Sequence, residues 1–149
     1  MARRGPRRKR RPGETVKVEQ PGLAKFLGEL EALVMETVWQ LGEATVHEVR
    51  QALEQQGHTF AYTTILTEMQ NLEKKGLLKS RREDRRNVYR PTRSRKAFIE
   101  ERVAQTVRSL LQDFPEEVLT HLLPEDAQAS EEALRLLEEL RKRYGKGSA

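Results

Sequence analysis

The chain has no cysteine, few aromatic residues and no long apolar run. The lack of cysteine excludes disulfide frameworks, thiolate metal sites and cysteine nucleophiles, and it fits a reducing compartment, so we expect a cytoplasmic protein. No stretch of about 18 apolar residues occurs, so we expect no membrane span. Aromatic residues make up 5% and hydrophobic residues 36% of the 149 positions, which leaves little apolar surface for a roomy ligand pocket.

Charged residues are abundant, at 34%, and their signs are segregated along the chain. Residues 1–13 contain seven Lys or Arg and no acid, and residues 74–96 contain eleven against Glu83 and Asp84. Because the whole chain carries +5, the remainder carries −11. Such clustering favours a polyanion partner, since each neutralised phosphate releases condensed counterions. For residues 1–13 taken alone, a solvated charge run explains the pattern equally well.

Motifs for chemistry are missing from the sequence. His47, His58 and His121 are scattered without the spacing of metal ligands, so we interpret them as surface residues and expect no metal. No glycine-rich phosphate loop, nucleophile elbow or catalytic carboxylate pair occurs. We therefore expect neither an enzyme nor a cofactor.

Local patterns divide the chain into three parts. Residues 1–20 are rich in Arg, Pro and Gly, which predicts a disordered basic arm. Residues 21–92 form a predicted domain with helices at about 23–41, 46–56 and 60–75 and strands at 77–82 and 87–91. Thr45 and Glu48 have capping-box spacing for the second helix, Thr59 is the expected cap of the third, and Gly76 its expected C′ residue.

Residues 93–149 predict three helices with one apolar stripe each. The first starts near Arg93, the second extends from Pro115 to Pro124, and Ser130 is the expected cap of the last. Single stripes cannot enclose a core, so they need a partner surface, and a two-fold related copy of the chain is the simplest one. The alternative is that the helices fold back on the N-terminal domain. The expected dimer contacts are Ile99, Val103, Val107, Leu110, Leu137 and Leu140.

The helix at 60–75 and the basic hairpin after it suggest DNA binding. One helix face carries Ile65, Met69 and Leu72, and the opposite face has hydrogen-bonding groups without a carboxylate, which suits a DNA major groove. The hairpin arginines can reach phosphate. These features predict a mainly α winged helix-turn-helix domain with a small β-hairpin wing, plus a C-terminal helical dimerisation domain. The expected DNA contacts are Thr63, Thr64, Thr67, Gln70, Asn71, Lys74, Arg81, Arg82, Arg85 and Arg86.

Three segments resemble the penicillinase repressor family of the BlaI/MecI type: LGELEALVMETVWQLGEATVHEVRQAL, AYTTILTEMQNLEKKGLL and NVYRP. The resemblance implies a cytoplasmic bacterial repressor that dimerises and binds palindromic operators with TACA/TGTA-like half-sites. It also implies DNA contacts from Thr63, Thr64 and Thr67, and from Arg81, Arg82 and either Arg85 or Arg86 in the wing.

Two features of the family are absent. Some of its repressors are cut by a membrane sensor protease at an Asn-Phe bond, whereas the corresponding region reads Thr120-His121-Leu122-Leu123. The resemblance thus leaves a sensor protease open as a further partner. A copper-responsive branch carries a C-terminal cysteine motif, which this chain lacks.

The leading hypothesis is a homodimeric repressor that binds double-stranded operator DNA. Two alternatives stay open: a ligand-sensing winged-helix regulator, and a nucleoid-type protein that binds DNA without sequence preference. Competition between operator and random DNA at fixed salt distinguishes the repressor from the nucleoid-type protein.

Overall fold

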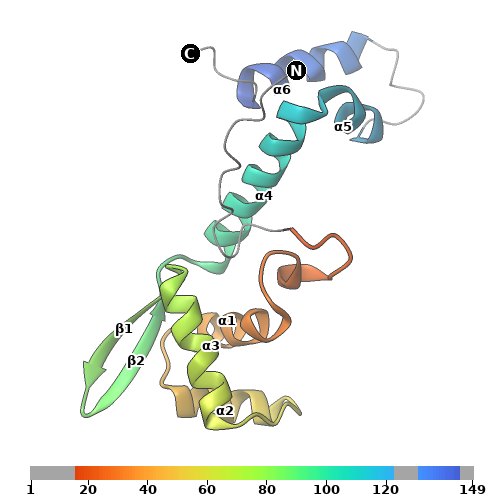
Figure 1. Ribbon diagram of the computed structural model, residues 1–149. Coiled ribbons are helices and arrows are strands. Elements are labelled where there is room, and N and C mark those ends of the chain that lie inside the picture. The colour runs from red at the N-terminus through yellow and green to blue at the C-terminus, as the bar shows by residue number, and fades with distance from the viewer. Residues whose placement is uncertain (1–15, 123–130, 145–149) are drawn as a thin grey trace, which may run out of the picture. The chain divides into compact units, whose positions relative to one another are not determined.

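The computed structural model describes residues 16–122 and 131–144. The chain divides into two compact units that separate between Ile99 and Glu100. The first unit contains η1 (Gly22–Lys25), α1 (Glu29–Leu41), α2 (Val46–Gln55), α3 (Tyr62–Lys74), β1 (Leu78–Glu83), β2 (Arg86–Pro91) and the first turn of α4 (Arg95–Asp113) (Figure 1). The second contains the rest of α4, α5 (Pro115–Leu122) and α6 (Glu131–Tyr144).

The first α-helix is shorter than predicted. It begins at Glu29 and not at 23, because Gly28 is its N-cap and the Glu31 carboxylate accepts a hydrogen bond from the Gly28 N–H at 3.1 Å. The residues before it form the short 3₁₀ helix η1. Leu23 and Leu27 nevertheless lie in the core. Their apolar spacing therefore predicted correctly that they are buried, but it predicted wrongly that they belong to the first α-helix.

Two of the three predicted helix-end signals are confirmed. Thr45 Oγ1 accepts a hydrogen bond from the Glu48 N–H, and the Glu48 carboxylate accepts one from the Thr45 N–H. Gly76 follows the last turn of α3 with φ +79°, a backbone conformation that residues other than glycine rarely adopt. The prediction for Thr59 is wrong: α3 starts at Tyr62 after Ala61, which makes no side-chain cap.

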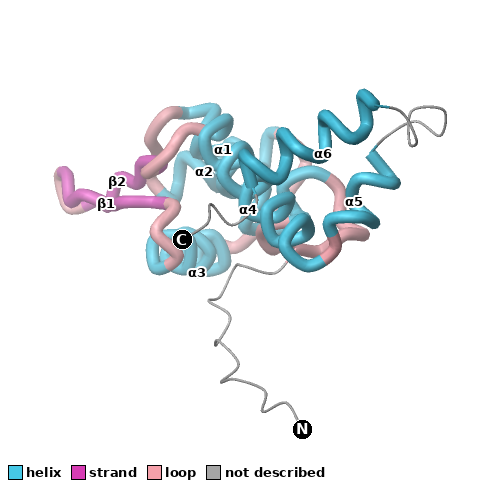
Figure 2. Tube along the Cα trace, turned by 90° about the horizontal axis from the view of Figure 1, so that it is seen from above, coloured by secondary structure: helices cyan, strands magenta, loops and turns pink. Residues whose placement is uncertain are grey.

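The strands form an antiparallel hairpin, shown in magenta in Figure 2. Glu83 pairs with Arg86, and the two residues between them, Asp84 and Arg85, have φ of 45° and 65°. Two positive φ angles make a type I′ turn, whose twist matches that of the strands. Asp84 thus adopts the left-handed conformation that its side chain tolerates.

An isolated β-bridge extends the two-stranded sheet. Ala44, between α1 and α2, pairs with Tyr89 through two backbone hydrogen bonds of 2.9 Å. Since Tyr89 also pairs with Ser80, β2 lies between β1 and the bridging residue Ala44. Leu78 and Tyr89 are buried, so alternation along the strands places Arg81 and Val88 on the opposite face.

The core of the first unit draws on all its elements. Tyr89 is 1% exposed, and Trp39 packs on the core with its ring centroid 5.7 Å from that of Phe98. Both aromatic side chains therefore contribute to the core. Burial of Phe98 means that the first turn of α4 belongs to this unit, and the half-buried Ile99 packs against the same core. The buried apolar residues are Leu23, Leu27, Ala32, Val34, Met35, Val38, Ala44, Val46, Val49, Leu53, Ile65, Met69, Leu72, Leu78, Tyr89 and Phe98.

Several apolar side chains among the described residues of the second unit are exposed or only half-buried. From Glu100 onward, no side chain that the structure describes is fully buried. Val103 and Leu110 are 44% and 45% exposed, and Val107 is half-buried. The start of α5 at Pro115 is confirmed. The predicted stop at Pro124, the predicted cap at Ser130 and the side chains of Leu137 and Leu140 lie outside the described residues.

Candidate nucleic-acid interface

Helix α3 exposes a face free of carboxylates. Its buried side is made by Ile65, Met69 and Leu72. Every exposed residue of the helix is neutral or basic, while its two acids, Glu68 and Glu73, are half-buried. Of the predicted contacts, only Asn71 is half-buried. The exposed residues are Tyr62, Thr63, Thr64, Thr67, Gln70 and Lys74.

The two acids of α3 lie outside its exposed face. Glu73 accepts hydrogen bonds from the Ser80 hydroxyl at 2.7 Å and from the Ser80 N–H at 3.3 Å, which joins the helix to β1. Burial raises the pKa of the Glu68 carboxyl, and the nearby charge of Glu31 raises it further. Glu73 is thus held by β1, and both acids are half-buried, so neither contributes to the exposed face of α3.

The threonines of α3 differ in hydrogen bonding. Thr67 donates its hydroxyl proton to the Thr63 carbonyl oxygen at 2.8 Å, so its oxygen can only accept from a ligand. The Thr64 hydroxyl makes no hydrogen bond to a described residue and can donate or accept. Thr64 is therefore the more versatile hydroxyl for reading a base edge.

An open groove beside α3 includes residues that sequence reasoning did not select. Helical spacing puts Tyr62 on the apolar side of α3, but it is 38% exposed, and its ring centroid lies 4.7 Å from that of His47. As the first residue of α3, Tyr62 packs on α2 instead of the core. Helical spacing cannot reveal this contact, because His47 belongs to another helix. The groove is lined by Thr45, Val46, His47, Glu48, Gln51, Tyr62, Leu66, Arg85, Arg86 and Asn87.

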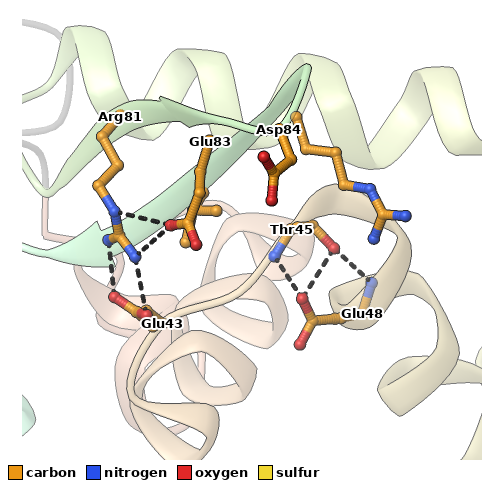
Figure 3. Close-up of a pocket in the computed structure, with 8 residues that line it drawn as sticks. Glu43, Thr45, Glu48, Arg81, Glu83 and Asp84 are labelled. Carbon is orange, nitrogen blue, oxygen red and sulfur yellow. Dashed lines mark hydrogen bonds and ion pairs between the residues drawn. The ribbon is translucent and has the colours of Figure 1, made fainter.

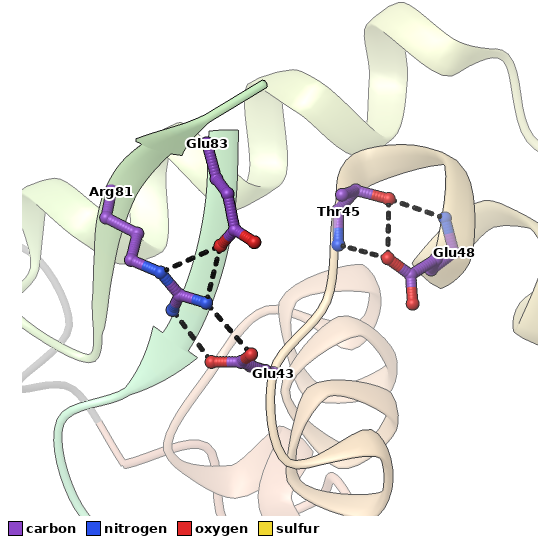
Figure 4. A network of polar contacts seen from close by, with 5 residues as sticks. All are labelled: Glu43, Thr45, Glu48, Arg81 and Glu83. Carbon is purple, nitrogen blue, oxygen red and sulfur yellow. Dashed lines mark hydrogen bonds and ion pairs between the residues drawn. The ribbon is translucent and has the colours of Figure 1, made fainter. Parts of the chain in front are cut away.

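The four predicted wing arginines fall into two groups. The side chains of Arg82, Arg85 and Arg86 are exposed and make no ion pair or hydrogen bond to the residues that the structure describes. Arg81, in contrast, binds the carboxylates of Glu43 and Glu83, as Figures 3 and 4 show. Its guanidinium holds the pKa of the Glu43 carboxyl below its usual range. The exposed wing charge available to a ligand is thus smaller than the number of arginines suggests.

The histidines lie on the surface, as predicted. His47, His58 and His121 are all exposed. Within residues 16–122 and 131–144, no group of three or more His, Asp or Glu is placed to hold a metal ion. Over the same residues, no helix is long and apolar enough to cross a membrane.

Together these elements define a winged helix-turn-helix unit: three helices, an exposed polar third helix, and a basic hairpin that follows it. The sequence matches the family model described as penicillinase repressor over residues 27–143. The chain therefore belongs to the penicillinase repressor family, in agreement with the resemblance seen in its motifs.

Individual relatives are similar over part of the chain. The proteins named transcriptional regulator BlaI from two Mycobacterium tuberculosis strains (CDC 1551 / Oshkosh and ATCC 25618 / H37Rv) are each 39% identical over 74 residues. This match covers 49% of the chain and 53% of each relative, so it spans about half the length of these curated relatives. A solved structure of Bordetella bronchiseptica BpsR, described for regulation of its DNA binding by 6-hydroxynicotinic acid, shares 18% identity with a TM-score of 0.43. That likeness covers 78% of this chain and 75% of the other.

Proposed function

We propose that this chain is a sequence-specific DNA-binding transcriptional repressor. The observation that carries the proposal is the exposed face of α3, which offers hydroxyl, amide and ammonium groups and no carboxylate. A helix of this kind can enter the major groove and meet base edges with hydrogen-bond donors and acceptors. Membership of the penicillinase repressor family supports the same function.

In this proposal, α3 reads the bases and the wing contacts the backbone or the minor groove. Thr63, Thr64 and Thr67 face the bases, with Gln70, Asn71 and Lys74 further along the helix. Arg82, Arg85 and Arg86 neutralise phosphates, since their side chains have no partner among the described residues. The His47–Tyr62 pair lines a groove together with Arg85 and Arg86, which adds the start of α2 to the proposed interface.

The active form in this proposal is a homodimer on a palindromic operator. Two exposed apolar side chains on α4, Val103 and Leu110, and the half-buried Val107 support a two-fold interface in the second unit. A dimer with two copies of α3 presents equivalent surfaces to two half-sites of TACA/TGTA-like sequence. The proposed setting is the cytoplasm, and the proposed role is regulatory and not enzymatic.

Release from DNA requires a signal. A sensor protease is one candidate partner, although the region compared with the family cleavage site carries Thr120, His121 and Leu122 in α5 and no Asn-Phe bond. A protease acting here would need a different bond, and we propose no particular one.

A binding competition tests the function. Full-length protein is titrated into a labelled duplex that carries two inverted TACA/TGTA-like half-sites, against an unlabelled random duplex of equal length at fixed salt. A repressor should prefer the specific duplex by about 10³-fold or more. Equal affinity for both duplexes would indicate a nucleoid-type protein, and binding to neither would exclude DNA as the partner.

A further inference from the structure

Arg81 connects two separate parts of the winged-helix unit. Its Nη1 and Nη2 atoms donate to the two carboxylate oxygens of Glu43 at 2.7 and 2.9 Å, and its Nε and Nη2 atoms donate to Glu83 Oε2 at 3.2 and 2.9 Å. Glu43 lies between α1 and α2, whereas Arg81 and Glu83 belong to β1. Figure 4 shows the guanidinium between the two carboxylates. We call these three residues the wing brace.

The brace spans the full width of the small sheet. Ala44 pairs with one edge of β2 and β1 pairs with the other, so Glu43 and Arg81 come from opposite sides of β2. The ion pair lies on the face of the sheet opposite to the buried Tyr89. Only two backbone hydrogen bonds, both between Ala44 and Tyr89, otherwise join residue 44 to β2. A side-chain contact that reaches from β1 across β2 to residue 43 therefore restricts the angle between the hairpin and the helices.

The geometry also makes Arg81 a poor phosphate ligand. A guanidinium binds a phosphate through the same fork of N–H groups that Arg81 already gives to Glu43. Two carboxylates beside the guanidinium would also repel an approaching phosphate. The adjacent Arg82 is exposed and has no such partner among the described residues.

We propose that Arg81 is a positioning residue that holds the wing at the angle required for DNA binding, and that Glu43 is its essential partner. The inference rests on the proposed function in naming DNA as the ligand. It leads to an unusual expectation: removing the negative charge of Glu43 weakens DNA binding. Simple electrostatics predicts the opposite, because a less acidic protein attracts a polyanion more strongly.

The first test measures binding of the full-length chain to a random duplex at fixed salt. Glu43→Gln and Arg81→Gln should each weaken binding about two- to five-fold, the range that partly exposed ion pairs reach. The double variant Glu43→Gln with Arg81→Gln should be no weaker than the weaker single variant, because both changes remove one interaction. Glu54→Gln is the matched control: it removes the same charge from an exposed side chain of α2 that has no described partner, and it should not weaken binding.

An exchange of the two charges distinguishes a positioning role of Arg81 from a direct contact between Arg81 and DNA. The variant Glu43→Arg with Arg81→Glu keeps one guanidinium between two carboxylates and leaves the net charge unchanged. It should bind more tightly than either single variant and approach the wild-type affinity if the interaction itself matters. A DNA contact made by Arg81 would not be restored. Failure of this exchange, or a Glu43→Gln variant that binds as well as or better than wild type, would overturn the proposal.

Hydrogen exchange tests the brace without DNA. Glu43→Gln should speed exchange of the Ala44 and Tyr89 amides, whose hydrogen bonds join residue 44 to β2, and leave the buried α2 amide of Val49 unchanged. Unaltered exchange at both amides would overturn the proposal that Arg81 positions the wing. If the wild-type chain binds no DNA, the proposed function fails, and this measurement alone decides whether Arg81 positions the hairpin.

Discussion

Lys75 Nζ lies 2.7 Å from a carboxylate oxygen of Glu31, and this ion pair joins the C-terminal cap of α3 to the first turn of α1. The two side chains are 22% and 11% exposed, so the pair is largely shielded from water. Glu31 also accepts the N–H of Gly28, the N-cap of α1. One carboxylate thus links the start of α1 to the end of the proposed recognition helix.

Loss of this pair should destabilise the first unit. Lys75→Met leaves the Glu31 carboxylate shielded and without its cation, which should lower the free energy of unfolding by about 1–3 kcal/mol. Urea denaturation followed by circular dichroism measures the change. Arg95→Met is the control, because Arg95 pairs with Glu36 at a more exposed site and should cost at most about 1 kcal/mol. Equal losses of unfolding free energy in the two variants would mean that the shielding of Glu31 from water does not strengthen its ion pair with Lys75.

Base reading should depend on the free hydroxyl of Thr64. Thr64→Val keeps a methyl group but removes the hydroxyl, and Thr64→Ala removes both the hydroxyl and the methyl. We expect Thr64→Ala to weaken binding to an operator-like duplex by about 1–3 kcal/mol and to leave random-duplex binding nearly unchanged. Fluorescence anisotropy on both duplexes provides the comparison. A similar loss on random DNA would show that Thr64 does not read sequence.

Salt dependence should report the wing contacts. Arg85→Ala and Arg86→Ala each remove an exposed guanidinium near the hairpin turn, so each should weaken binding to all sequences alike. The slope of log affinity against log salt should flatten by about 1 for each phosphate that the variant no longer neutralises. Titrations at several salt concentrations measure it. A double variant with the wild-type slope would place the turn away from DNA.

Truncation should separate DNA binding from dimerisation, and the cut must follow Ile99. The Trp39 indole N–H donates to the Arg93 carbonyl oxygen at 2.9 Å, and Phe98 is 4% exposed. A chain ending at Ile99 should therefore be a folded monomer that binds one half-site weakly, since it lacks the second half-site's contribution. A chain ending at Pro91 loses Phe98 and should unfold at a lower temperature. Sedimentation and thermal melting test both statements, and a monomeric full-length chain at concentrations that saturate DNA would contradict the dimer.

Sequence periodicity was informative wherever an interaction is local. The burial of Ile65, Met69 and Leu72 repeats at helical spacing, so the faces of α3 can be assigned from the sequence. The Thr45–Glu48 capping box depends on residues three apart and is equally visible. The start of α1 cannot be read from the sequence. Leu23 and Leu27 keep helical spacing although they precede the helix, because tertiary packing buries them.

The sequence by itself determined the type and order of the main elements, the polar face of α3 and the basic character of the hairpin. These properties follow from side-chain pattern over a few residues, which the backbone geometry of helices and strands converts directly into faces. Only the tertiary structure decided which arginine is engaged by carboxylates. Arg81 and Arg82 are neighbours of the same chemical type, and they differ because Glu43, 38 residues before Arg81, lies within reach of one and not the other. Such partners depend on how the chain folds back on itself, and no local pattern encodes that distance.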